Sequence, residues 1–565
     1  MKKKHLLWII SLLFANQTMV AQPNNVELDD PKPGDQSVWS TQKNVALGWG
    51  SIDVRYSRSQ VPTTSAKPLQ LSAWRGERVS AQAVLSTPVD LSKVTFTVSD
   101  LKCGKEVIEA KNIRKYFVRY VMTDWHNNKA DSFLLPDRLD PVESMHVAAN
   151  TTRPLWVDIK VPADTKAGKY KGTLSVNCDG QTLALPLQLQ VANQVLPEPK
   201  DWSFHLDLWQ NPYAVARYFQ VPLWSQAHFD AMRPIMTELA NMGQKVITAS
   251  IIQHPWNSQT YDPFESMIAK MKQVDGTWKY DYTVFDKWIE FMLSCGITEQ
   301  IDCYTLVPWH YKFDYYDCAT NSTKYINCQP KEQAYRDLIL PFLKDFAKHL
   351  KAKGWFDRTC IAMDERPMDQ MDAAYAVVKE ADPNYRLAGA ANYDVDSEEA
   401  NKIYDMSVAH DFKLLSKESL QKRSDKGLIV TYYTCCGPDR PNTFTFSDPA
   451  ESAYLGWHAA AVGYDGYLRW AYCSWPAQPN QDTRFITWPS GDTFISYPDG
   501  SSIRQQRMVE GIQAYEKIRI LRQKATPAQQ KMLDAVLEKF AMNQYDNEVD
   551  AADIVNEGKS VLSKF

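Results

Sequence analysis

The stretch YRDLILPFLKDFAKHLKAKGWFDRTCIAMD, residues 335–364, joins a long amphipathic segment to a short apolar run. From Tyr335 to Leu350 the apolar side chains recur three and four residues apart, which predicts a helix. Thr359 to Asp364 is short and almost wholly apolar before its final acid, which is typical of a buried strand. The stretch therefore predicts a helix that leads into a buried strand.

The same alternation recurs on both sides of this stretch. Further helices are expected around residues 229–239, 285–293 and 373–379. The expected strands are residues 204–208, 245–251, 300–305, 359–364, 386–391, 404–409, 428–433 and 466–471. Short strands with helical crossovers are typical of parallel sheets, and eight of them over roughly 300 residues fit a (β/α)8 TIM barrel. A doubly wound open sheet is the alternative, but no Gly-rich phosphate loop follows any strand.

Apolar and polar residues alternate in the part of the chain before residue 196. Clear examples are residues 79–85, 155–161 and 183–191, with turn residues at 163–168 and 179–180. A period of two puts one face of a strand in a core and the other in water. Several such strands without helices between them predict an antiparallel β-sandwich over residues 22–196.

Two prolines mark the change of pattern, in Leu196-Pro197-Glu198-Pro199-Lys200. Because proline cannot donate to a sheet, we interpret this segment as a stiff linker. We place the barrel at residues 197–524. Residues 525–565 form a helical segment that we expect to pack beneath or beside the barrel.

The N-terminal residues have the pattern of a secretory signal peptide. Lys2 to Lys4 precede the apolar run Leu6 to Phe14, and a short polar stretch leads to Val20-Ala21. We expect cleavage near Ala21 and a periplasmic protein without a lipoprotein anchor, since the first cysteine is Cys103. No later segment is apolar enough to be an integral membrane helix.

Charge and cysteine content exclude several classes of partner. With 63 basic and 67 acidic residues the net charge is −4, so nucleic acid is not an expected partner. Ten cysteines permit disulfides in an exported protein, and Cys318 and Cys328 could close a polar loop. Mostly free buried thiols, with one or two bridges, are favoured. No His or Cys pair has ligand spacing with an acid, so we expect no metal and no cofactor.

Catalytic groups of a TIM barrel come from the carboxyl ends of its strands. Those ends carry Asp207, Trp209, His254, Trp256, Tyr304, Trp309, Asp364, Glu365, Asn392, His410, Tyr432, Tyr433, Arg469, Trp470 and Tyr472. The set is rich in carboxylates and aromatic rings, as in many sugar-binding sites, and contains no nucleophile elbow.

Two acids, Asp364 and Glu365, end the fourth predicted strand. An apolar run that ends in two carboxylates costs desolvation free energy unless the acids have a function or partners. Catalysis is one interpretation, and a structural ion pair with Arg366 is the other.

Several stretches, together with this pair, resemble one family over nearly the whole mature chain and in the same order. They are residues 74–77 (WRGE), 153–156 (RPLW), 166–170 (KAGKY), 466–472 (GYLRWAY) and 504–516. The family is glycoside hydrolase family 123, the retaining β-N-acetylgalactosaminidases. Asp364-Glu365 resembles the catalytic pair of this family. The resemblance implies a sandwich followed by a barrel, and an oligosaccharide substrate with a terminal β-linked GalNAc, of the glycosphingolipid type.

It also implies substrate-assisted catalysis, in which the 2-acetamido oxygen of the substrate is the nucleophile and an oxazolinium intermediate forms. Asp364 would orient the acetamide, and Glu365 would protonate the leaving oxygen. We expect the charge of Asp364 and a dry pocket to raise the pKa of Glu365, and a donor to keep Asp364 ionised.

Substrate contacts are expected from further strand-end residues. Tyr304 or Tyr433 would donate a hydrogen bond to the acetamide oxygen, and Trp470 would line the methyl pocket or pack against the sugar ring. Asn392, His410 and Asp207 would bind ring hydroxyls, although each of these side chains could equally be part of the core. Two other functions remain open at this point: a glycosidase of the same fold with another substrate, and a non-catalytic glycan-binding protein of the envelope.

Overall fold

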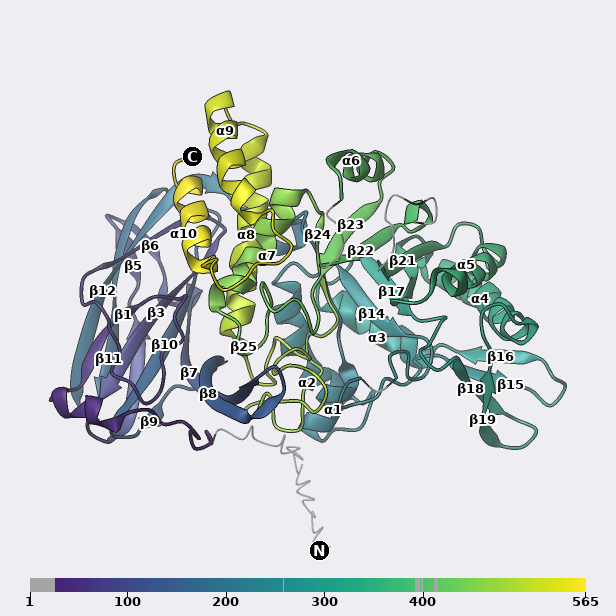
Figure 1. The fold of residues 1–565 in the computed structure, drawn as a ribbon, viewed down its shortest axis with the longest axis horizontal. Coiled ribbons are helices and arrows are strands. Elements are labelled where there is room, and N and C mark those ends of the chain that lie inside the picture. Colours follow the sequence, from purple (N-terminus) through teal and green to yellow (C-terminus); the bar gives the residue numbers. More distant parts are fainter. Residues whose placement is uncertain (1–25, 258, 392–396, 398–399, 411–414) are drawn as a thin grey trace, which may run out of the picture.

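The computed structural model describes residues 26–257, 259–391, 397, 400–410 and 415–565. The predicted signal peptide and the predicted site residue Asn392 lie outside the described residues. The described chain forms a β-sandwich followed by a barrel of parallel strands with helices around it (Figure 1).

The sandwich consists of two sheets with strand orders β1-β3-β10-β7-β8-β25 and β2-β12-β11-β4-β9, the second extended by β5 and β6. Its pairs are antiparallel, as predicted, except that β2 runs parallel to β12. The strands are β1 (Ala46–Gly50), β2 (Leu69–Arg75), β3 (Arg78–Thr87), β4 (Leu91–Val98), β5 (Leu101–Cys103), β6 (Glu106–Ile108), β7 (Ile113–Trp125), β8 (Asn128–Asp140), β9 (Met145–Val147), β10 (Thr151–Lys160), β11 (Gly168–Cys178), β12 (Gln181–Val195) and β25 (Ser501–Ser502).

The barrel confirms all eight predicted strands to within two residues at each end. They are β13 (His205–Leu208), β14 (Val246–Ser250), β17 (Gln300–Tyr304), β20 (Thr359–Met363), β21 (Arg386–Ala391), β22 (Asp405–Ala409), β23 (Ile429–Tyr433) and β24 (Gly466–Arg469). All neighbouring pairs are parallel. The circle is nearly closed, since β13 and β14 meet only through a bridge between Leu206 and Gln244.

Helices cover the outside of the barrel. They are α1 (Pro212–Phe219), α2 (Gln226–Ala240), α3 (Thr283–Ser294), α4 (Gln333–Lys353), α5 (Met368–Ala381), α6 (Lys417–Asp425), α7 (Pro449–Val462) and α8 (Ile503–Arg522). In α2 the side chains of Met232, Met236 and Leu239 are buried, as the three-and-four spacing predicts. Because the eight parallel strands form a nearly closed circle, the alternative of a doubly wound open sheet is excluded.

A separate four-stranded sheet, which the sequence pattern did not predict, projects from the barrel at the lower right of Figure 1. Its strands β15 (Ala269–Lys272) and β16 (Trp278–Asp281) follow β14, and β18 (Lys312–Asp317) and β19 (Ser322–Asn327) follow β17.

The C-terminal helices α9 (Pro527–Leu537) and α10 (Ala551–Leu562) lie with α8 between the sandwich and the barrel (Figure 1). The ring of Phe540 stacks on Trp457 of α7 with centroids 4.8 Å apart. At the chain end, the carbonyl oxygen of Phe565 accepts a hydrogen bond from Gln194 of β12 at 2.7 Å. The segment therefore contacts both parts of the molecule.

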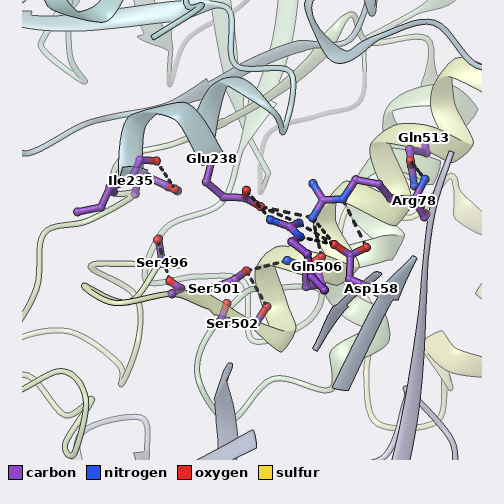
Figure 2. A network of polar contacts seen from close by, with 12 residues as sticks. Arg78, Asp158, Ile235, Glu238, Ser496, Ser501, Ser502, Gln506 and Gln513 are labelled. Atoms are coloured by element: carbon purple, nitrogen blue, oxygen red, sulfur yellow. Dashed lines mark hydrogen bonds and ion pairs between the residues drawn. The ribbon is translucent and has the colours of Figure 1, made fainter. Parts of the chain in front are cut away.

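Charged side chains join the sandwich to the barrel (Figure 2). Asp158 of β10 pairs with Arg78 at 3.0 Å and with Arg114 at 2.6 Å. Both arginines also contact Glu238 of α2, at 3.3 and 2.8 Å. Gln506 of α8 accepts a further hydrogen bond from Arg78 at 2.9 Å. Because the network is largely buried and uses elements of both parts, it fixes their relative orientation.

The long β7–β8 hairpin of the sandwich reaches the loop between β24 and β25. Met122 donates to Gln481 O at 2.8 Å and accepts from the Thr483 amide at 2.9 Å. Ser490 Oγ donates to Asp124 Oδ1 at 2.8 Å. The sandwich thus supports a loop at the carboxyl end of a barrel strand.

All ten cysteines are free thiols, including Cys318 and Cys328, so the loop between them is closed without a disulfide, by the β18–β19 pairing and an ion pair between Lys324 and Asp317 at 2.6 Å. Among the described residues, no helix is both long and apolar enough to cross a membrane.

Candidate active site

The acid pair follows directly after β20, whose five residues are all buried. Asp364 and Glu365 are partly buried, and α5 begins three residues beyond Glu365, at Met368. The pair therefore stands at the carboxyl end of the fourth barrel strand, where barrel enzymes place their chemistry.

Asp364 has two hydrogen-bond donors. The indole Nε1 of Trp309 donates to Oδ2 at 3.2 Å, and the backbone amide of Glu365 donates to Oδ1 at 2.9 Å. Burial and the charge of Glu365 nevertheless raise the pKa of Asp364 to about 6, against the opposing effect of the two donors and Arg366. The expectation of an ionised Asp364 therefore holds only above about pH 6.

Glu365 is held from the other side of the barrel. The hydroxyl of Tyr433, the last residue of β23, donates a hydrogen bond to its Oε1. Burial and the negative charge of Glu365 raise the pKa of Tyr433 far above its usual range, so this hydroxyl keeps its proton and remains a donor.

Arg366 does not pair with either acid among the described residues. Its guanidinium lies over the rings of Trp309 and Tyr311, at 5.0 and 4.9 Å from their centroids. The structural ion pair considered from the sequence is therefore not formed, and Arg366 instead packs against the ring that donates to Asp364.

Tyr304 lies at the end of β17 within a group of aromatic rings. Its ring centroid is 4.5 Å from that of Trp209 and 5.2 Å from that of Trp256, and those two indoles stack at 4.9 Å. Burial and several carboxylates, Asp364 among them, raise the pKa of Tyr304 well above its usual range. Tyr304 is only 1 % exposed, and its proposed contact with substrate stays a prediction.

Trp470, just after β24, is partly exposed, and its indole Nε1 donates to Asp492 Oδ1 at 3.2 Å. Asp492 is buried, and it also accepts from Arg469 at 2.7 Å. Burial raises the pKa of Asp492 to about 6, although Arg469 and Trp470 oppose the shift. The rings of Trp470 and Trp488 meet in a T-shaped contact with centroids 5.8 Å apart, so the Trp470 ring is fixed from two sides.

His410 and Asp207 occupy different positions. His410 follows β22, its amide donates to Tyr433 O at 3.0 Å, and its partly exposed ring lies beside Gly437. Asp207 is 2 % exposed inside the barrel, where it accepts from Trp209 at 3.2 Å. Burial and the charge of Asp405 raise the pKa of Asp207 to about 7. The predicted roles of these two residues in binding sugar hydroxyls stay predictions.

The structure thus joins Asp364, Glu365 and Tyr433, and adds residues to which the sequence assigned no role. The sequence places Trp309 among the strand-end residues, but it does not show that Trp309 donates to Asp364. Asp492 lies in a long irregular loop, and no pattern in the sequence marks it. No cluster of three His, Cys, Asp or Glu side chains suited to a metal ion occurs in the described part of the chain.

Comparison with known proteins identifies the family of the chain. A family model described as the glycoside hydrolase 123 catalytic domain matches residues 209–521, and one for the glycoside hydrolase 123 N-terminal domain matches residues 49–178. A comparison with curated proteins finds no significant match.

Among solved structures, a family 123 glycoside hydrolase from Clostridium perfringens, studied for glycolipid glycan hydrolysis, is 27% identical. The match covers 92% of this chain and 97% of the C. perfringens chain, with a TM-score of 0.84. Two β-glucuronidases are much less similar. Those of Bacteroides uniformis and Parabacteroides merdae are 10% and 11% identical over 84% of this chain and 52% of theirs, with TM-scores of 0.29 and 0.30. The catalytic match covers more than half of the chain, and the chain therefore belongs to glycoside hydrolase family 123.

Proposed function

We propose that the protein is an exo-acting, retaining β-N-acetylgalactosaminidase that removes terminal β-linked GalNAc through an oxazolinium intermediate. The observation that carries this proposal is the position of the two acids. Asp364 and Glu365 are consecutive residues at the end of one strand, and each accepts a hydrogen bond from its own donor, Trp309 or Tyr433. Ordinary retaining glycosidases place a nucleophile and an acid about 5–5.5 Å apart across the bond, whereas substrate-assisted families use the acetamido group instead.

Asp364 has the features of the group that orients the acetamide. Above about pH 6 it is an anion. Hydrogen bonds from Trp309 and from the Glu365 amide restrict its rotation. An anion placed beside the acetamide N–H would stabilise the positive charge that develops on nitrogen as the ring closes.

Glu365 has the features of the proton donor. Tyr433 occupies Oε1, so the proton for the leaving oxygen belongs on Oε2. When the intermediate is hydrolysed, the same carboxylate takes a proton from the attacking water, as microscopic reversibility requires. Tyr433 therefore positions the acid, a role different from the acetamide contact that the sequence suggested.

The C. perfringens relative was studied for the hydrolysis of glycolipid glycans, which supports the glycan of a glycolipid as the substrate class. The partly exposed Trp470, fixed by Asp492 and Trp488, suits stacking against a pyranose ring.

The test compares two aryl glycosides with the same leaving group, a 2-acetamido-2-deoxy-β-galactoside and a plain β-galactoside. Only the first should be cleaved at a useful rate, the released sugar should retain its configuration by NMR, and a GalNAc-derived thiazoline should inhibit. Equal cleavage of both glycosides would show that the acetamido group takes no part.

We further propose export to the periplasm, with residues 1–21 removed. The cationic and apolar segments at residues 2–14 support this proposal. N-terminal sequencing of protein from a periplasmic extract should begin at Gln22.

A further inference from the structure

Two adjacent cysteines lie at the rim of the site. Cys435 and Cys436 begin the loop after β23, two and three residues beyond Tyr433. Their sulfur atoms are 3.9 Å apart. Cys435 is partly buried, and Cys436 is exposed. The proposed mechanism uses neither thiol.

The main chain around Cys435 is fixed on several sides. Its amide donates to Gly437 O at 2.9 Å, and its carbonyl accepts from Asn442 Nδ2 at 3.1 Å. Asn442 is buried, and its own amide donates to Glu451 at 2.8 Å. One residue of the pair therefore has a fixed main chain and a partly buried side chain, and the other is exposed, the arrangement found in thiol pairs that react in sequence.

We propose that Cys435 and Cys436 form a modification site that reacts with low-molecular-weight disulfides and closes into a disulfide between neighbouring residues. In the first step the Cys436 thiolate attacks a disulfide RSSR, a mixed disulfide forms at Cys436, and RS⁻ leaves. In the second step Cys435 loses its proton and attacks the sulfur of Cys436, and the second RS⁻ leaves. The two thiols give up two electrons and two protons, and RSSR is reduced to two RSH.

The electrostatic surroundings favour this order of attack. The side-chain hydrogen bond between Cys435 and Cys436 lowers the pKa of the Cys436 thiol, although burial and the charges of Asp492 and Glu365 oppose the shift. The same hydrogen bond, together with burial, raises the pKa of Cys435, which therefore stays protonated until the second step. The accessible sulfur is thus the better nucleophile of the two.

Ring closure would affect the acid, and this part of the inference rests on the proposed function. The sulfur atoms must move from 3.9 Å to about 2.05 Å. Residues 435 and 436 must then rearrange next to Tyr433, whose hydroxyl positions Glu365. We expect kcat to fall roughly tenfold in the oxidised protein, because the proton donor loses its alignment, while KM changes little.

The experiment treats the full mature chain with oxidised glutathione and maps its cysteines by mass spectrometry. In the native chain, the peptide that contains both cysteines should become two hydrogen atoms lighter and carry no glutathione. C435S should instead accumulate a glutathione adduct on Cys436. C436S should form neither product at this peptide. C103S, which removes a partly exposed thiol in the sandwich, is the matched control and should behave as the native chain.

The mass measurement needs no substrate, so it decides the modification site even if the aryl glycosides are not cleaved. An unchanged peptide in the native chain, or an adduct that never closes, would overturn the site. A closed ring with unchanged kcat would overturn its effect on the acid. Dithiothreitol should restore both the mass and kcat.

Discussion

The hydroxyl of Tyr433, at the end of β23, donates a hydrogen bond to Glu365, which follows β20 three strands away in the barrel. No local sequence pattern links two residues 68 positions apart. The parallel order of β20, β21, β22 and β23 brings their carboxyl ends to one face. The barrel thereby places a neutral donor against one of two neighbouring acids and gives those acids different surroundings.

Replacement of Tyr433 by Phe should reduce kcat about 10- to 100-fold, because a hydrogen bond to a charged group contributes roughly 1.5–3 kcal/mol. The kinetics of an aryl 2-acetamido-β-galactoside measure this loss. Tyr432→Phe is the control, since the Tyr432 hydroxyl bonds to Leu455 O at 2.7 Å in the core. That variant should lose about 1 kcal/mol of stability and little activity.

If Tyr433 acts by positioning Glu365, the effect of Tyr433→Phe should depend on the presence of Glu365. In an E365Q background the second substitution should cost almost nothing, because the two residues act as one unit. Additive losses in the double variant would show that Tyr433 acts elsewhere, for example on the acetamide.

The pH profile of kcat/KM should fall on the acid side near pH 6. Burial and the charge of Glu365 raise the pKa of Asp364 to about 6, and the reaction needs its anion, so activity is lost as pH falls through that value. Trp309→Phe removes a donor to the anion and should move this limb upward by about one pH unit.

Trp488→Phe is the matched control, because the Trp488 indole donates to a backbone carbonyl, Gln259 O, at 2.9 Å. Its acid limb should stay where the native limb lies. An unshifted limb in Trp309→Phe would mean that Asp364 is not the group whose ionisation is observed.

Substrates with different leaving groups can distinguish the proton donor from the anion that orients the acetamide. Glu365→Gln should lose about 10²–10⁴-fold on a substrate with a poor leaving group and far less on a dinitrophenyl glycoside, which departs without protonation. Asp364→Asn should lose activity on both, since ring closure of the acetamide accompanies the departure of either leaving group. The reverse pattern would exchange the two roles, and an intact rate in both variants would place the catalytic groups elsewhere. A native chain that binds the glycosides without cleaving them would favour a glycan-binding protein.

The sequence predicted the barrel well because each buried strand is a short apolar run between helices with clear three-and-four spacing, as in residues 335–364. The four strands of the projecting sheet escaped prediction. They are four to six residues long, and their exposed faces carry residues such as Lys272 and Tyr325, so neither an apolar run nor a regular alternation marks them.

The site was predictable only as far as strand ends reveal it. Asp364, Glu365 and Tyr433 each end or follow a strand and could be named. Their partners depend on the paths of loops: Trp309 reaches Asp364 from the segment between β17 and β18, and Asp492 reaches Trp470 from a loop that the sandwich supports. Such paths are set by tertiary contacts, and the local sequence does not encode them.

The network between sandwich and barrel predicts a stability effect remote from the chemistry. Asp158 is 2 % exposed and lies between Arg78 and Arg114. Asp158→Asn should lower the free energy of unfolding by about 3 kcal/mol, because the substitution leaves two guanidinium groups without their anion. Glu198→Gln, which breaks a half-exposed pair with Lys160 at 3.3 Å, should change it by less than about 1 kcal/mol.

The sign of the pH dependence gives a second check on Asp158. Burial would raise its pKa, but Arg78 and Arg114 outweigh burial and hold it below the usual 3.8. The carboxylate therefore contributes its full stability above about pH 4, and that contribution is lost as pH falls through the lowered pKa. Thermal unfolding of the native chain and of D158N should differ most near neutral pH and converge in acid. A difference that stays constant down to the acid limit of folding would show that the lost contacts, and not the charge, account for the effect.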